Sequence, residues 1–395
     1  MLAACGGQPA EVPVQHVSMK LTDSSSGFGL KLLDTLLAEK GAGNVFISPL
    51  SATILLSMVA SAAKGDTRAA MLTALGMDPS VDPSVEIAAT IKRLAQSDSN
   101  AQFELAQAVW AQKGLGLSPA YVKKLREDYR AELANLDFQA PDASKVVNRW
   151  VDNATHHKID SIVDSFDPAT VGFLVNATYF HALWQTEFKK AGEGDFQTFA
   201  GSKARLPMMR RDEGITLVRT ATYDAALLPF KGGRFSALLL VPRDPLSPKG
   251  FSSFLVRETW NQVLIQLHRA VGGTLGGKCV SPNTETAEVS VDCRGLLVMP
   301  KFKLEYKKDL SDALTAIGYP VPAGLLEFCG GCSLDYVIQK TYLEVDEKGT
   351  TAAAVTGGAV VVSLPVPLVL DRPFALALID NATDAPLFLG AIGDL

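Results

Sequence analysis

The feature that most constrains this chain is a run of small, uncharged residues near its C-terminal end. From Gly349 to Leu370 no residue carries a charge, and between positions 350 and 358 every residue is Thr, Ala, Val or Gly. The run directly follows a predicted strand, 336–345, which is rich in aromatic and β-branched residues. Side chains this small bury little apolar area, so packing alone does not hold the run in one shape. One interpretation is a passive surface linker.

A second interpretation is that this run can itself become a strand. Alternate side chains of a strand face one side, and one face here would carry only small residues: Thr350, Ala352, Ala354, Thr356 and Gly358. Such a face can enter between two existing strands without burying a charge, which would cost several kcal/mol. Each new backbone hydrogen bond contributes roughly 1 kcal/mol. We therefore expect that insertion of the run into a sheet could drive a large rearrangement.

The order of the predicted elements indicates an α+β fold in one continuous unit. Apolar periodicity and Ser-Pro starts predict helices early in the chain and two more later, at 30–37, 49–63, 117–136, 142–163, 250–270 and 310–317. Alternating or continuous apolar runs between turn residues predict strands mainly in the second half, at 173–180, 225–230, 235–241, 289–291, 296–302, 336–345, 374–380 and 386–391. Helices followed by strands favour α+β over a doubly wound sheet.

Charge and motifs exclude several classes of function. The net charge is −5, with 37 Lys+Arg interspersed among 42 Asp+Glu, so no basic tract predicts a nucleic-acid partner. The sequence lacks the nucleophile elbow, the zinc-protease motif and the dinucleotide-binding motif. We therefore expect no catalytic residues and no cofactor. Five histidines keep a hydrolase open as an alternative, because a triad need not follow any sequence order.

The cysteines permit two disulfides in an exported protein. They occur as Cys279 with Cys293 and as Cys329 with Cys332. The second pair also has the spacing of half a zinc site or of a redox motif. No second such pair exists and no paired histidines follow it, so we expect no metal.

The N-terminus is similar to a bacterial lipobox. Residues 2–6 read Leu-Ala-Ala-Cys-Gly, which would make Cys5 the lipid-bearing residue, although the preceding signal-peptide regions are missing. An alternative is a chance Ala-rich start. We expect residues 1–26 to be a lipobox remnant and flexible tether, with the membrane reached only through a lipid. The uncharged run 349–370 is not expected to span a membrane, because it contains Gly357-Gly358 and two prolines.

The small-residue run resembles the hinge of the serpins, the serine protease inhibitor family. The matching residues are Glu347, Lys348, Gly349, Thr350, Thr351, Ala352, Ala353 and Ala354. The resemblance implies one domain over 27–395 with a large central mixed sheet, two smaller sheets and eight or nine helices. It also implies an exposed reactive-centre loop over 347–372. The early segment 44–51, the strand segment 174–180 and the C-terminal segments 371–374 and 386–390 resemble the family in the same order.

The resemblance assigns further residues to the regions that open when the loop inserts, called the shutter and the breach. These residues are Ser48, Ser51, Asn176, Trp184 and Gln339. Gln339 stands where the family often has His, so hydrogen bonding can persist while a histidine-based pH response is lost. The stretch 271–295 is longer than usual, and we expect it to be a surface excursion closed by Cys279 and Cys293.

The resemblance also implies a mechanism. A serine protease cleaves the loop, forms a covalent acyl-enzyme, and is dragged and distorted as the hinge inserts. Spacing places the cut at Val362-Ser363 or at Ser363-Leu364. Three valines before it favour elastase-like or subtilisin-like targets over trypsin-like ones. We expect a monomer that is extracellular or in a bacterial cell envelope. The alternative is a non-inhibitory member that acts as a binding protein, whose hinge would normally carry bulky or charged residues.

Overall fold

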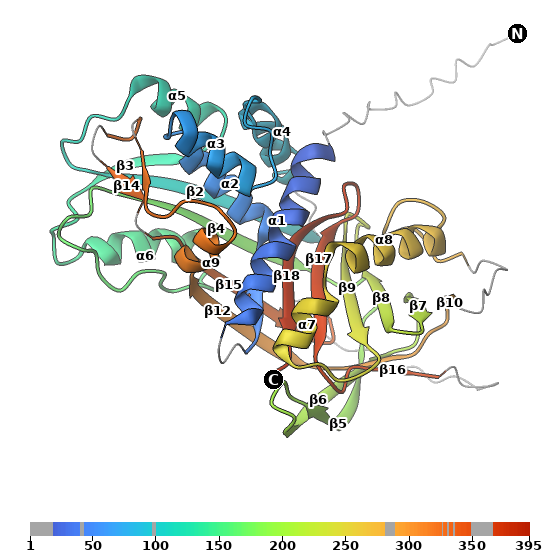
Figure 1. Ribbon diagram of the computed structural model, residues 1–395. Helices are drawn as coiled ribbons and strands as arrows, with labels where there is room; N and C mark the ends of the chain where they lie inside the picture. Colours follow the sequence, from blue (N-terminus) through green and yellow to red (C-terminus); the bar gives the residue numbers. More distant parts are fainter. Residues whose placement is uncertain are drawn as a thin grey trace, which may run out of the picture.

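The computed structural model describes residues 19–39, 43–96, 100–280, 289–325, 327–329, 332–334, 336–348 and 366–395. Figure 1 shows the helices of residues 49–127 on one side of the long strands 101–112 and 172–182, and the helix of residues 143–154 on the other side. The helices of residues 248–271 lie beside the strands 235–242 and 374–380. The helices of these residues are α1 (Met19–Ala38), α2 (Pro49–Ala60), α3 (Gly65–Ala74), α4 (Ser84–Leu94), α5 (Pro119–Glu127), α6 (Ala143–Ala154), α7 (Pro248–Phe254), α8 (Arg257–Val271) and α9 (Ser311–Ala316).

The strands form one large antiparallel sheet and several smaller ones, as the α+β expectation requires. The large sheet has the order β1 (Val45–Ile47), β18 (Ala385–Ile392), β17 (Phe374–Asp380), β9 (Phe235–Pro242), β8 (Tyr223–Pro229), β7 (Thr216–Thr220) and β10 (Val289–Asp292). A second sheet has the order β16 (Leu368–Val369), β11 (Leu297–Pro300), β6 (Lys203–Arg211) and β5 (Lys189–Gln197).

Two further groups of strands share the remaining side of the molecule. One has the order β3 (Glu132–Leu136), β2 (Ala101–Gln112) and β4 (Gly172–Ala182). The other pairs β12 (Phe302–Asp309) with β15 (Ile338–Val345). A small hairpin pairs β13 (Ala323–Gly324) with β14 (Ser333–Leu334). The parallel pairing of β2 with β3 makes this side mixed, whereas the large sheet is antiparallel throughout.

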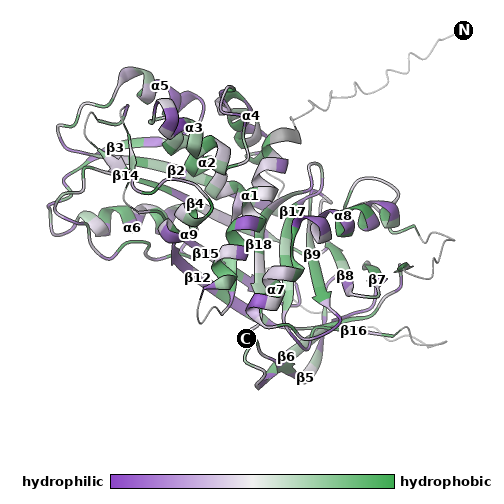
Figure 2. Ribbon diagram, in the orientation of Figure 1, coloured by the Kyte–Doolittle hydropathy of each residue, from purple (hydrophilic) through white to green (hydrophobic). Residues whose placement is uncertain are grey.

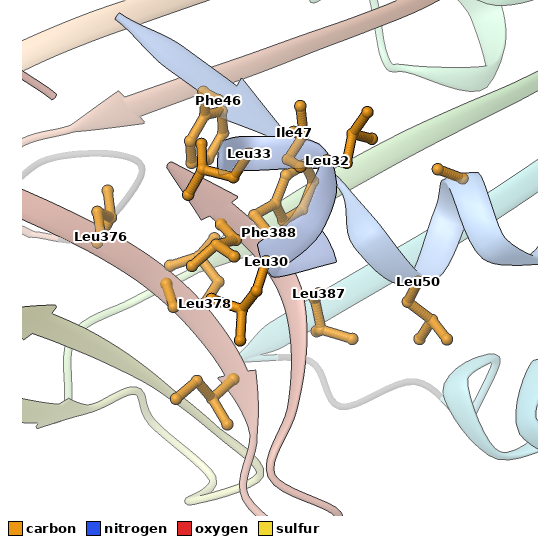
Figure 3. Close-up of a cluster of buried hydrophobic side chains, with 14 of the residues drawn as sticks. Leu30, Leu32, Leu33, Phe46, Ile47, Leu50, Leu376, Leu378, Leu387 and Phe388 are labelled. Carbon is orange, nitrogen blue, oxygen red and sulfur yellow. The ribbon is translucent and has the colours of Figure 1, made fainter. Parts of the chain in front are cut away.

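The main core lies between the large sheet and helices α1 and α2. Every residue of β9 and β17 is buried, which fits strands that are covered on both faces, and Figure 2 shows both as hydrophobic along their length. In Figure 3, leucines of α1 meet Phe46 and Phe388, whose rings stack with centroids 5.4 Å apart. This packing fixes the position of Ser48, which follows β1 and precedes α2.

Two expected helices are shorter in the structure than the sequence suggested. The helix expected over 117–136 ends at Glu127, because Arg130 has a φ of 52° and residues 132–136 instead pair with β2 as a parallel strand. The helix expected over 142–163 ends at Ala154, because His156 and His157 also take positive φ values, 50° and 61°. Strand β2 was not anticipated at all.

The expected tether is also too long. Residues 19–26 belong to α1, where Leu21 and Ser25 are buried against the rest of the fold. Hydrophobic anchoring of these residues favours a helix over an extended linker. Within the described residues, no helix combines the length and the apolar character needed to cross a membrane.

Candidate functional site: the seam between β4 and β15

Strands β4 and β15 lie side by side, but no hydrogen-bonded ladder joins them in the described part of the chain. We call this line the seam. At its lower end the rings of Phe173 and Tyr336 are 6.3 Å apart, and at its upper end the Trp184 amide donates to the Lys348 carbonyl over 2.9 Å. The two strands therefore run parallel, and each leaves one edge without a strand partner. The mixed sheet that we expected at the centre is present as two halves.

One polar bridge links β15 to the start of α2. The Gln339 side chain accepts a hydrogen bond from the Ser48 amide and donates one to the Ser48 carbonyl, both over 3.2 Å. Ser48 Oγ donates to the Leu387 carbonyl over 2.6 Å instead of capping α2. Gln339 therefore acts once as an acceptor and once as a donor toward the same residue, as a carboxamide can.

A second polar cluster lies under β4. Ser51 Oγ donates to Asn176 Oδ1 over 2.5 Å, and Thr178 Oγ1 donates to Ser51 Oγ over 2.9 Å. Asn176 Nδ2 is buried and has no hydrogen-bond acceptor among the described residues. Ser51, Asn176 and Gln339 all border one small cavity of about 10 Å³. The structure thus brings four predicted shutter residues together, and it leaves a buried donor next to the seam.

The upper end of the seam is closed by Trp184. Its Nε1 donates to the Asp346 carbonyl over 2.9 Å, and its ring stacks on Phe230 with centroids 4.4 Å apart. The Phe188 amide donates to the Glu347 carbonyl over 2.7 Å. Backbone contacts therefore hold residues 346–348 at the end of β4, at the point where the chain passes into the expected hinge.

Glu347 is held by an ion pair with Lys301, whose Nζ lies 2.9 Å from its carboxylate. Partial burial of Glu347 opposes its ionisation, but the bond to Lys301 outweighs burial and lowers the pKa of Glu347. The same bond raises the pKa of Lys301. Lys348 is buried, and its Nζ has no partner among the described residues. The side chain of Glu347 is therefore fixed by its ion pair, whereas within the described chain that of Lys348 is held by burial alone.

Charged side chains connect the segment after α6 to strands on both sides of the seam. Lys158 reaches Glu344 of β15 over 3.5 Å, and Asp160 pairs with Lys340 of β15 over 3.3 Å. On the other side, His156 lies 3.1 Å from Glu104 of β2. These pairs connect one surface segment to strands on both sides of the seam, so the segment must move if the strands separate.

The floor of the seam is apolar. A cavity of about 20 Å³ lies below it and is lined by side chains of both the seam strands and the large sheet, among them Phe180, Leu228, Leu343 and Leu376. The side chains around this cavity expose almost no polar atoms. Small side chains that entered the seam would therefore pack on an apolar surface.

Several predicted residues lie outside the described residues: Cys5, the hinge positions Gly349, Thr350, Thr351, Ala352, Ala353 and Ala354, and the expected cleavage positions Val362, Ser363 and Leu364. Both expected disulfides are present, Cys279 with Cys293 and Cys329 with Cys332. In the part of the chain that the structure describes, no three His, Cys, Asp or Glu side chains are arranged to hold a metal.

The structure adds residues that the sequence analysis did not single out. Lys301, Phe188 and Thr178 join the site, and Thr341 of β15 donates to the Phe46 carbonyl over 2.6 Å. Lys301 lies within the predicted strand 296–302, but that pattern gives no sign of its ion pair with Glu347. The others depend on contacts between segments far apart in sequence.

Comparisons with known proteins agree with this geometry. A family model described as Serpin (serine protease inhibitor) matches residues 23–395. Iripin-8 of Ixodes ricinus is 30% identical over 420 aligned residues, which cover 100% of this chain and 98% of that protein. Leukocyte elastase inhibitor A of Mus musculus is 27% identical, with coverage of 94% and 99%.

The fold also matches that of solved structures. The native structure of the thermophilic serpin tengpin superimposes with a TM-score of 0.77 at 23% identity and covers 100% of this chain and 98% of that one. The family model, the relatives and the unpaired seam lead to one conclusion: the chain belongs to the serpin (serine protease inhibitor) family.

Proposed function

We propose that this chain inhibits serine proteases by inserting residues 349–362 into the seam after the reactive-centre loop is cleaved. The observation that carries the proposal is the pair of unpaired strand edges, which border the seam where Lys348 leads into the loop. A segment that turns back after β15 would run antiparallel to both β15 and β4. It would satisfy both edges at once, each new backbone bond contributing roughly 1 kcal/mol.

The loop sequence suits such a position. Thr350, Ala352 and Ala354 alternate with Thr351 and Ala353, so one face of the new strand would point down to the apolar floor and the other to solvent. No charge would be buried. The protein is not an enzyme: the protease supplies the catalysis and remains attached as an acyl-enzyme, and the inhibitor is consumed once.

The two faces of the inserted strand provide a matched test. Thr350→Arg would place a charge on the buried face, and Thr351→Arg would place the same charge on the solvent face. With pancreatic elastase, the unaltered protein and Thr351→Arg should form a complex of summed mass that survives boiling in detergent. Thr350→Arg should be cleaved without forming a complex. Equal complex formation by both variants would show that insertion on this face is the wrong explanation.

The target class and the cleaved bond are further parts of the proposal. Val360, Val361 and Val362 suit a protease with a small aliphatic pocket, and no Arg or Lys lies between 349 and 370. We therefore expect complexes with elastase-like or subtilisin-like enzymes. Mass spectrometry of the released C-terminal peptide should show a cut at Val362-Ser363 or Ser363-Leu364. Robust inhibition of trypsin would contradict this specificity.

We also propose that the protein is a bacterial lipoprotein of the cell envelope that acts as a monomer. The lipobox-like residues around Cys5 support this, since two acyl chains would anchor the protein without a spanning helix. Mass spectrometry of the membrane-extracted protein should detect a lipid-modified N-terminal cysteine. An unmodified Cys5 in the mature chain would contradict the anchor and leave the inhibitory mechanism untouched.

A further inference from the structure

A disulfide closes the hairpin that leads into β15. Strands β13 and β14 pair, and Cys329 and Cys332 are joined in the connection between them, with Cα atoms 5.4 Å apart. The Leu325 amide donates to the Cys332 carbonyl, and the Cys329 amide donates to the Leu325 carbonyl, each over 3.0 Å. The bond therefore joins Cys329 to Cys332, which backbone hydrogen bonds also hold close to Leu325.

This turn places Phe328 on the first residue of β4. Phe328 is buried, and a Cβ added to Gly172 would lie only 2.1 Å from its ring, so the ring rests directly on the Gly172 backbone. The ring also meets Tyr121 edge-on at 6.3 Å. The neighbouring Glu327 amide donates to the Ala62 carbonyl over 2.9 Å. The hairpin is thus anchored to the helical side and to β4.

The same segment continues into β15 and so spans the lower end of the seam. Four residues after Cys332, Tyr336 lies against Phe173 of β4 with ring centroids 6.3 Å apart. Together, the contacts of Phe328 with Gly172 and of Tyr336 with Phe173 hold the start of β15 against the start of β4. We call these two contacts the lower clamp. An inserting strand that runs the full length of the seam must separate them.

The Cys329–Cys332 bond differs from the other disulfide in what it can stabilise. Its cysteines are 3 positions apart, whereas Cys279 and Cys293 are 14 apart. A shorter closed loop restricts the unfolded chain less, so the short bond contributes less to global stability. Both Cys329 and Cys332 are partly exposed, and a small dithiol can reach them. The effect of the short bond is therefore concentrated on the turn that it closes.

We propose that the Cys329–Cys332 disulfide is a redox-modification site that controls how readily the lower end of the seam opens. A thiolate of a dithiol reductant attacks one sulfur and releases the other, and the second thiol of the reductant then closes its own disulfide. Two electrons pass to the pair, and Cys329 and Cys332 each end as a thiol after taking up a proton. Reduction frees the turn, loosens Phe328 and weakens the lower clamp.

The functional consequence rests on the proposed inhibitory insertion. A weaker lower clamp lowers the barrier to full separation of β4 and β15, so the reduced protein should incorporate a strand several-fold faster than the oxidised protein. The same change should make spontaneous insertion of the uncleaved loop faster, which removes active inhibitor. A reducing environment would thus shorten the active lifetime of the protein.

The test uses the full chain, treated or untreated with dithiothreitol, and two double variants. Cys329→Ser with Cys332→Ser removes the proposed site, and Cys279→Ser with Cys293→Ser is the matched control. Alkylation and mass spectrometry record which thiols are free. Two readouts follow: amide hydrogen exchange of residues 172–176 and 336–340, and the rate at which a synthetic peptide with the sequence of residues 349–362 is incorporated. Phe328→Ala serves as a mimic of the loosened clamp.

We expect reduction to speed both exchange and incorporation in the unaltered protein and in the control variant. The Cys329→Ser/Cys332→Ser protein and Phe328→Ala should be fast with or without reductant. Unchanged exchange at the lower seam, with Cys329 and Cys332 shown to be free thiols, would overturn the inference. If exchange speeds up but no form incorporates the peptide, the redox clamp stands and the proposed insertion mechanism fails.

Discussion

At the scale of single residues, Gln339 fixes one of the two strands that border the seam. It satisfies both the amide and the carbonyl of Ser48, and so it ties β15 to the start of α2. Asn176, on the opposite strand, has its oxygen occupied and its amide donor unpaired among the described residues. In the middle of the seam the two strands are therefore held to α2, whereas Trp184 at the upper end and the lower clamp at the lower end hold them to each other.

Removal of the Gln339 amide should destabilise the native form. Gln339→Leu keeps the approximate volume but leaves the Ser48 amide without its side-chain partner, which costs about 1–3 kcal/mol. The Ser48 carbonyl loses one of its two donors and keeps the Ala52 amide. The midpoint of urea unfolding, followed by circular dichroism, should fall accordingly. Gln139→Leu is the control, since Gln139 is exposed on the surface. Equal midpoints for both variants would mean that the bridge contributes nothing.

At the scale of elements, the end of α8 is tied to the turn between β17 and β18 by His268. Its Nε2 lies 2.8 Å from Asp384, and its Nδ1 contacts the Gly273 carbonyl. A carboxylate and a carbonyl can only accept hydrogen bonds, so both ring nitrogens can bond at once only when the imidazole is protonated. Partial burial lowers the pKa of His268, but these two bonds outweigh burial and raise it above its ordinary value.

This tie predicts a pH-dependent stability. Because the pKa of His268 is higher in the folded state, its contribution is fully present below the unfolded pKa of about 6.5 and is lost as pH rises through the folded pKa. The unfolding midpoint of the unaltered protein should therefore fall as pH rises through this window. His268→Gln should flatten that dependence. If the unfolding midpoints of the two proteins depended on pH in the same way, the bonds to Asp384 and Gly273 would not raise the pKa of His268.

Among the strands, some could be predicted from sequence patterns and others could not. Strands β8, β9, β17 and β18 were located within a few residues, because each is mostly apolar and bounded by turn residues. Strand β2 was missed because its Ala, Gln, Glu and Leu residues favour helix locally, and its pairing with β4 and β3 overrides that preference. The hinge stays a prediction from the small-residue run and the family resemblance, because residues 349–354 lie outside the described residues. The seam could not be predicted from sequence patterns, since an unpaired edge is a property of two distant strands.

At the scale of the whole molecule, the proposed insertion implies that the native form is metastable. In the described part of the chain, the facing edges of β4 and β15 lack a strand partner, and a strand that paired with both would give a sheet of lower free energy. Under this proposal, cleavage of the loop removes the tether that keeps the chain from reaching that state. The unfolding temperature of the cleaved protein should therefore rise by roughly 15 °C, if a dozen new bonds each add about 1 kcal/mol to this chain of 395 residues. Differential scanning calorimetry checks this, and an unchanged midpoint would contradict it.

The most direct test of the account is amide hydrogen exchange along β4 and β15 before and after cleavage of the loop, with β9 as an internal control. We predict that exchange in residues 172–182 and 338–345 slows strongly after cleavage, because an inserted strand pairs with the edges of both β4 and β15. Exchange in residues 235–242 of β9 should stay unchanged. Equal exchange of β4 and β15 in the native and cleaved proteins would show that no strand enters the seam, and the proposed mechanism would be wrong.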